Sequence, residues 1–232
     1  MTIPNYIKTD NKLRLEVRTK GEAFVYYRKG KALEIGKLKV DKMYGNTPDT
    51  KLAVSNPPEY FKQIKKSIDS WLEKEKNRGE FDTEQNVAQR NQTTRDRYIV
   101  LDMEYAFEQN RIRKENREKK SVFDLLGIER ASNKIIFFEI KRGMGAIRGN
   151  SGIEDHIADF NTFIYGKNST IFRANLINDI KNIVADKLEL GIIKNFSLPE
   201  NLEKSDIELV FVFDPDEESE ISAFAKELNK RH

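Results

Sequence analysis

The chain has 232 residues, of which 38% are apolar and 34% charged, and its net charge is +3, which suits one moderate domain or a core with a small appendage. It has no cysteine and only two histidines, His156 and His232, which excludes disulfides and thiolate metal sites and leaves little for a histidine-based zinc site or catalytic triad. Any bound metal is therefore expected on carboxylates, whose oxygen atoms favour Mg²⁺, Mn²⁺ or Ca²⁺.

The first part of the chain is expected to form a small antiparallel sheet. In residues 12–38 apolar residues alternate with charged ones, and Gly21 and Gly30 mark the turns between three such runs. We predict a β-rich appendage over residues 1–48, which either offers a docking surface or covers a sheet edge. A proline-containing linker would join it to a core over residues 55–232.

The remaining elements predict a mixed fold. Asn56 can cap a helix whose first turn contains two prolines, and a weaker helix is expected from Asp82 to about Gln92. The later segments then predict three strands, two helices, one strand and a short helix, at residues 98–107, 122–128, 135–141, 153–164, 177–188, 207–213 and 221–228. This order predicts an α/β or α+β fold with a central mixed β-sheet flanked by helices.

Two neighbouring strands of this sheet carry the candidate chemistry. Glu139 and Lys141 are two residues apart, so they share a strand face, and a hairpin turn after Glu129 would bring Asp124 beside Glu139. Two carboxylates and the Ile140 carbonyl could hold a hard divalent cation, which acidifies a bound water and neutralises charge on a phosphate. Lys141 could orient or deprotonate that water.

The sequence context of this acid-x-lysine pattern makes it more specific than the three-residue pattern alone. An acid two residues before a lysine also occurs at four other places, beginning at Asp10, Asp49, Glu118 and Asp179. Only Glu139 and Lys141 end a strongly apolar strand, with a second acid inside another apolar strand 15 residues earlier. An acid in such a strand costs stability unless it is paired. The competing interpretation is a cross-strand ion pair on the surface.

These residues carry a family resemblance. Residues 121–130 read Ser-Val-Phe-Asp-Leu-Leu-Gly-Ile-Glu-Arg, and residues 134–143 read Lys-Ile-Ile-Phe-Phe-Glu-Ile-Lys-Arg-Gly. Together they resemble the core motif of the PD-(D/E)XK nuclease superfamily, and the element order resembles it over residues 57–213. The resemblance implies a restriction-endonuclease-like α-β-β-β-α-β core and cleavage of nucleic acid that depends on Mg²⁺ or Mn²⁺.

The resemblance also implies roles for single residues. Asp124 matches the first metal-binding acid of the family, Glu139 the second, and Lys141 the catalytic lysine. Phe123 stands where many members have proline. Members often carry a further glutamate on the helix before the sheet, and the candidates here are Glu73, Glu80 and Glu84.

Several weaker signals lie near these strands. Asp102 and Glu104 share a face of the first strand, where one could be a third carboxylate, although a solvated strand face is the commoner explanation. Asp155, His156 and Asp159 begin the next helix, where acids usually only complement the helix dipole, with a metal or substrate role as the alternative.

The charge pattern is compatible with a polyanionic partner, although an ordinary solvated surface is the simpler explanation of charge alone. The first 204 residues hold 38 Lys or Arg against 30 acids, whereas the remainder is acidic. Arg142 and Arg148, in a loop with two glycines, are candidate nucleic-acid contacts, and a basic cluster over residues 111–120 could grip phosphates or form a solvated hairpin.

The first hypothesis is therefore a metal-dependent endonuclease that hydrolyses phosphodiester bonds in nucleic acid, with DNA as the expected substrate. Cutting of both strands would need two sites, which makes a homodimer plausible. A second hypothesis is a non-catalytic nucleic-acid or protein binding module on the same fold, and a third is a chance motif whose side chains point apart. No run is apolar and long enough to span a membrane, and residues 1–10 lack the apolar stretch of a signal peptide, so a soluble cytoplasmic protein is expected.

Overall fold

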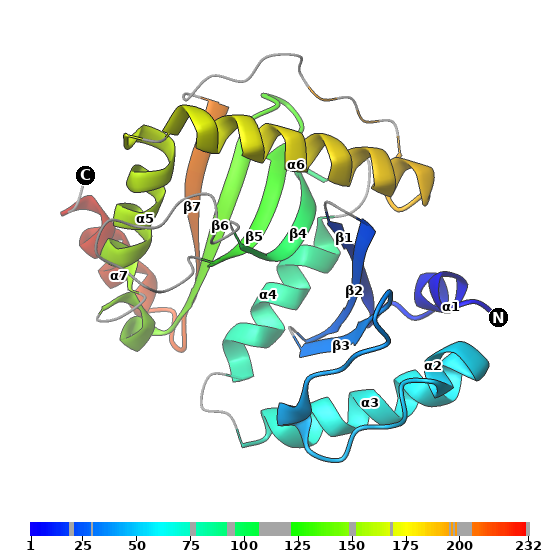
Figure 1. The fold of residues 1–232 in the computed structure, drawn as a ribbon. Coiled ribbons are helices and arrows are strands. Elements are labelled where there is room, and N and C mark those ends of the chain that lie inside the picture. The colour runs from blue at the N-terminus through cyan, green and yellow to red at the C-terminus, as the bar shows by residue number, and fades with distance from the viewer. Residues whose placement is uncertain are drawn as a thin grey trace. The chain divides into compact units, whose positions relative to one another are not determined.

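The computed structural model describes residues 1–18, 21–28, 30–74, 78–91, 96–106, 122–148, 152–167, 169–194, 196, 198 and 206–230. These residues form two compact units, Met1–Gln89 and Arg90–His232, each of which is described by itself (Figure 1). The helix that begins at Pro57, which the sequence assigned to the core, belongs to the first unit.

The first unit contains the expected antiparallel sheet, with strand order β1-β2-β3. Its elements are α1 (Ile3–Thr9), β1 (Arg14–Arg18), β2 (Glu22–Tyr27), β3 (Gly30–Glu34), the 3-10 helix η2 (Lys42–Tyr44), α2 (Leu52–Ser55), α3 (Pro57–Leu72) and α4 (Arg78–Arg90), whose last residue lies in the second unit. The short helix α1 was not predicted from the sequence.

Helix α3 forms as its capping residue and apolar spacing predict. The Asn56 side chain accepts a hydrogen bond from the Glu59 amide at 3.4 Å, and prolines occupy the first turn. The apolar stripe is buried, and the Tyr60 hydroxyl donates to the Ala32 carbonyl of β3 at 2.8 Å. Burial raises the pKa of Tyr60. The helix ends at Leu72.

Strand β1 is buried on both faces. Arg14 and Glu16 point away from the apolar side of the strand, yet they are only 4% and 0% exposed and form an ion pair. Arg14 also donates from Nη1 to the Ala88 carbonyl at 2.7 Å. These buried charges are therefore paired, as burial of a charge requires.

The second unit confirms an α+β fold with a central four-stranded mixed sheet of order β4-β5-β6-β7. Its elements are β4 (Tyr98–Ala106), β5 (Val122–Glu129), β6 (Ile135–Arg142), the 3-10 helix η3 (Met144–Ile147), α5 (Ile153–Tyr165), α6 (Ser169–Glu189), β7 (Ile207–Asp214) and α7 (Glu220–Asn229). The first two strand pairs are antiparallel, and β6 pairs with β7 in parallel. The parallel pair needs a long crossover, which α5 and α6 supply.

The core of the second unit lies between the sheet and the two crossover helices. Side chains of β4, β5 and β6, such as Leu101, Leu126 and Phe137, pack with side chains of α5 and α6, such as Phe163 and Leu176. Figure 1 shows α6 lying across the sheet. Within the described ranges, none of the helices has the length and apolar character that a membrane crossing requires.

A bulge in β4 breaks the simple alternation that the sequence predicts. The β4–β5 register shifts between Val100 and Asp102, so that Asp102 lies opposite Leu126. The side chain of Asp102 is fully buried, and its Oδ1 accepts from the Met103 amide at 2.9 Å. The expectation that Asp102 lies on a solvated strand face is therefore wrong, because residues 99–103 of β4 are buried on both faces of the strand.

Candidate functional site

The hairpin of β5 and β6 determines where the candidate residues lie. Its register runs from Ile128 opposite Ile135 to Leu125 opposite Phe138, and one further step places Asp124 opposite Glu139. The predicted turn is present, with the Asn133 amide donating to the Glu129 carbonyl at 2.8 Å. The hairpin therefore brings these two strand ends together.

Asp124 lies directly against β6. Its side chain is partly buried, and its Oδ2 accepts a hydrogen bond from the Ile140 amide at 2.8 Å. The carboxylate therefore sits within one residue of Glu139. This contact does not match a chance motif whose side chains point apart.

Glu139 and Lys141 form a buried pair on β6. They are 1% and 4% exposed, and Lys141 Nζ donates to Glu139 Oε2 at 3.5 Å. Their partners on β7 are Phe211 and Phe213, so two aromatic residues flank the pair on the neighbouring strand. Because both side chains are buried, the interpretation as a surface ion pair does not fit. Removing the two charges from water costs several kcal/mol, which their mutual attraction must offset.

His156 joins this pair from the first turns of α5. Its Nδ1 lies 3.1 Å from Glu139 Oε1, and its Nε2 lies 3.2 Å from Lys141 Nζ. The sequence signal was weak, since His156 could be assigned only to a helix start rich in acids. Its contacts depend on how α5 packs on the sheet, which local sequence does not reveal.

Glu104 is a second residue for which the sequence gave only a weak indication of a role in the site. Its neighbours in β4 pair with Leu125 and Phe123, so Glu104 lies across from Asp124, and its backbone has a φ of 53°. Carboxylate oxygens of Glu104 and Asp124 lie within 4.8 Å of each other. Two ionised carboxylates at this distance repel, and a cation between them removes that cost.

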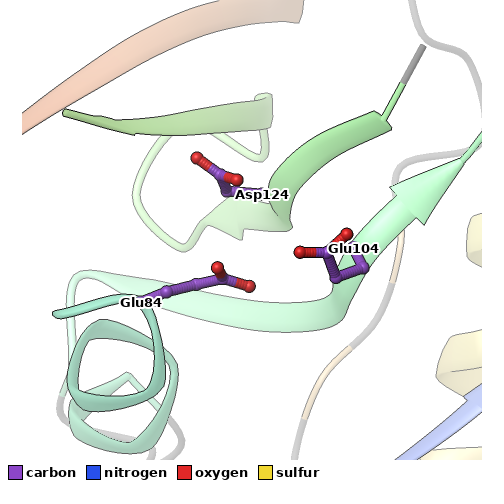
Figure 2. Close-up of side chains that lie close together, drawn as sticks. All are labelled: Glu84, Glu104 and Asp124. Atoms are coloured by element: carbon purple, nitrogen blue, oxygen red, sulfur yellow. The ribbon is translucent and has the colours of Figure 1, made fainter. Parts of the chain in front are cut away.

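Figure 2 shows Glu104 on β4 and Asp124 on β5. Among the glutamates suggested for the helix before the sheet, Glu84 is fully buried, whereas Glu73 is exposed. The side chain of Glu80 lies outside the described residues. Burial therefore favours Glu84 among the helix acids.

The two arginines suggested as nucleic-acid contacts, at the end of β6 and in the following segment, contact acids near the C-terminus. Arg142 pairs with Asp214 at 3.0 Å and with Asp216 at 3.4 Å. Arg148 is 70% exposed and lies 3.6 Å from Glu227. The basic cluster over residues 111–120 lies outside the described residues.

The glycine at the start of this loop is held in a conformation that suits glycine. Gly143 has a φ of 61°, and a Cβ at this position would lie 2.3 Å from Oδ2 of Asp216. The Asp216 carboxylate therefore lies directly against the backbone at Gly143.

No protein-family model matches the chain, and searches of curated proteins and of solved structures give no significant match either.

Proposed function

We propose that this protein is a magnesium-dependent nuclease of the PD-(D/E)XK type that hydrolyses phosphodiester bonds in DNA, acting as an endonuclease. The observation that carries the proposal is the arrangement of Asp124, Glu139 and Lys141. The first lies against the backbone of β6, and the other two form a buried pair on that strand. A buried, charged cluster at neighbouring strand positions costs folding energy, which a catalytic role would explain.

The donor atoms near Asp124 suit a hard divalent cation. They are oxygen atoms, and those of Asp124 and Glu104 lie close enough for one ion to contact both. In this proposal Asp124, Glu139 and the Ile140 carbonyl hold Mg²⁺ or Mn²⁺, and Glu104 adds negative charge beside them. A bound ion supplies an acidified water and neutralises charge on the scissile phosphate.

Lys141 has the role of holding a phosphate oxygen and orienting the attacking water. Its ammonium group is held by Glu139 on the same strand face, so its position is set before a substrate arrives. Arg142 and Arg148 would contact phosphates on the approach to the site. To bind DNA, these arginines would have to exchange their present acidic partners for phosphates of the DNA backbone.

Cleavage of both strands would require two sites, which a homodimer would provide. This consequence of the proposed function can be checked by experiments on the intact protein.

The test is cleavage of single-stranded, double-stranded and branched DNA with Mg²⁺ or Mn²⁺. Glu139→Gln removes a charge and keeps the side-chain shape, so cleavage should fall by about 10³-fold or more. The matched control is Glu208→Gln on β7, where Glu208 forms a half-exposed pair with Lys134, and its cleavage should match wild type. If wild type binds Mn²⁺ and DNA but cuts no substrate, the non-catalytic binding module becomes the better assignment.

A further inference from the structure

We infer that His156 is a positioning residue that ties the metal-binding Glu139 to Lys141 through its two ring nitrogens. This inference rests on the proposed function. The ring lies 3.1 Å from a Glu139 oxygen on one side and 3.2 Å from the Lys141 ammonium on the other. The side chains of the three residues are 14% exposed or less, so water competes little for these contacts.

The chemistry of the two neighbours determines the proton position on the ring. An ionised carboxylate can only accept a hydrogen bond, and an ammonium can only donate one. The favoured tautomer therefore carries its proton on Nδ1, toward Glu139, and presents the lone pair of Nε2 to Lys141. In this structure the Nδ1–Oε1 pair is close, at 3.1 Å, but lacks hydrogen-bond geometry. A neutral imidazole in this one tautomer has the right polarity for both neighbours.

The fold holds the ring in place through the start of α5. Ile153, in the first turn, is fully buried in a cluster with Ile147 and Phe224, and Ile157 packs against the same cluster. Phe211 and Phe213 of β7 complete this cluster, and they are the strand partners of Glu139 and Lys141. The apolar packing that anchors α5 is therefore adjacent to the charged pair that His156 bridges.

Each ring nitrogen then has a separate task. The Nδ1 contact orients one oxygen of Glu139, which should tighten metal binding, because hydrogen bonds behind a ligand typically change metal affinity by about 10- to 100-fold. The Nε2 contact directs the Lys141 ammonium, which should affect the rate of cleavage once the metal is bound. A ring that only fills space would not separate these effects.

Two conservative variants distinguish the tasks. In His156→Asn the amide can still donate from near the Nδ1 position, so Mn²⁺ affinity should stay within about threefold of wild type while the cleavage rate at saturating metal falls by about 10- to 100-fold. In His156→Gln the amide oxygen can still accept from near the Nε2 position, so the rate at saturating metal should be nearly retained while Mn²⁺ affinity falls by about 10- to 100-fold. His156→Ala should lose both.

The experiment combines Mn²⁺ calorimetry, cleavage at saturating metal, and nitrogen-15 NMR of the His156 ring in the metal-free protein. The matched control is Asn161→Ala, an exposed position on the same helix, which should change neither property. The NMR spectrum should show the proton on Nδ1; a proton on Nε2 overturns the inference.

The remaining outcomes separate this inference from the proposed function. If wild type binds Mn²⁺ and cuts DNA but His156→Ala does both equally well, or if the Asn and Gln variants both lose as much as the Ala variant, the positioning role is wrong and the nuclease assignment stands. If wild type neither binds Mn²⁺ nor cuts, the proposed function fails and this inference fails with it.

Discussion

Replacing Asp124 with asparagine separates its structural role from its proposed metal-binding role. Its Oδ2 accepts from the Ile140 amide at 2.8 Å, and an asparagine oxygen can accept the same bond. The substitution therefore keeps the contact with β6 but removes the charge that faces Glu104. Asp124→Ala removes both, which leaves the Ile140 amide without this acceptor.

The two variants should differ in stability when no metal is present. Losing the acceptor of a buried amide costs about 1–3 kcal/mol, whereas in Asp124→Asn the bond weakens by about 1 kcal/mol at most. Both variants lose the repulsion from Glu104, at 4.8 Å or less, which gains each of them on the order of 3 kcal/mol for two ionised groups at an effective dielectric constant of about 20. The expected order of stability is Asn at or above wild type, and Asn above Ala.

Added metal should close the gap between wild type and Asp124→Asn. A ligand present at about 100 times its dissociation constant stabilises the folded state by about 2.7 kcal/mol, and only wild type should gain that amount. The assay is urea unfolding in EDTA and in Mn²⁺, followed by far-ultraviolet circular dichroism. Tryptophan fluorescence is unsuitable, because the single tryptophan, Trp71, lies in the first unit.

An equal gain from Mn²⁺ in wild type and in Asp124→Asn would refute the reasoning, because the metal would then bind elsewhere. Glu208→Gln, on the same sheet, serves as the control and should gain as much as wild type.

Three further outcomes are expected. Lys141→Met keeps the length of the apolar stem, so Mn²⁺ affinity should change by less than about threefold while cleavage falls by about 10²- to 10⁴-fold; normal cutting by this variant would contradict the assigned mechanism. Arg148→Gln should weaken DNA binding equally for all sequences and reduce the slope of log affinity against log salt by about 1, as measured by fluorescence anisotropy. Burial, followed by the nearby Asp69 charge, raises the pKa of Tyr27 from 10.0 to about 12. The contribution of this shift to stability is therefore complete below pH 10 and is lost as the pH rises to about 12. In Tyr27→Phe this loss should be smaller, as measured by urea unfolding followed by Trp71 fluorescence.

The sequence alone was sufficient for the features that depend on local patterns. The cap at Asn56, the turn after Glu129 and the apolar runs predicted the helix α3, the β5–β6 hairpin and the order of the later elements, and the structure confirms them. Hairpin geometry also predicted that Asp124 reaches β6, because side-chain direction in a strand follows from its period of two. The nuclease activity itself stays a prediction.

Other features became visible only in the tertiary structure. Asp102 is buried because both faces of β4 are covered at this position, which depends on what packs on the sheet and not on the strand alone. The contacts of Arg142 and Arg148 with acids of the C-terminal part join residues far apart in the sequence.

His156 shows the same limit most clearly. The sequence by itself determined that two acids and a lysine occupy neighbouring apolar strands. It could not determine that a histidine on α5 would lie between Glu139 and Lys141, because that position depends on how an apolar cluster seats the helix on the sheet. Local chemistry is thus set by strand periodicity, whereas the surroundings of each charged group are decided by long-range packing.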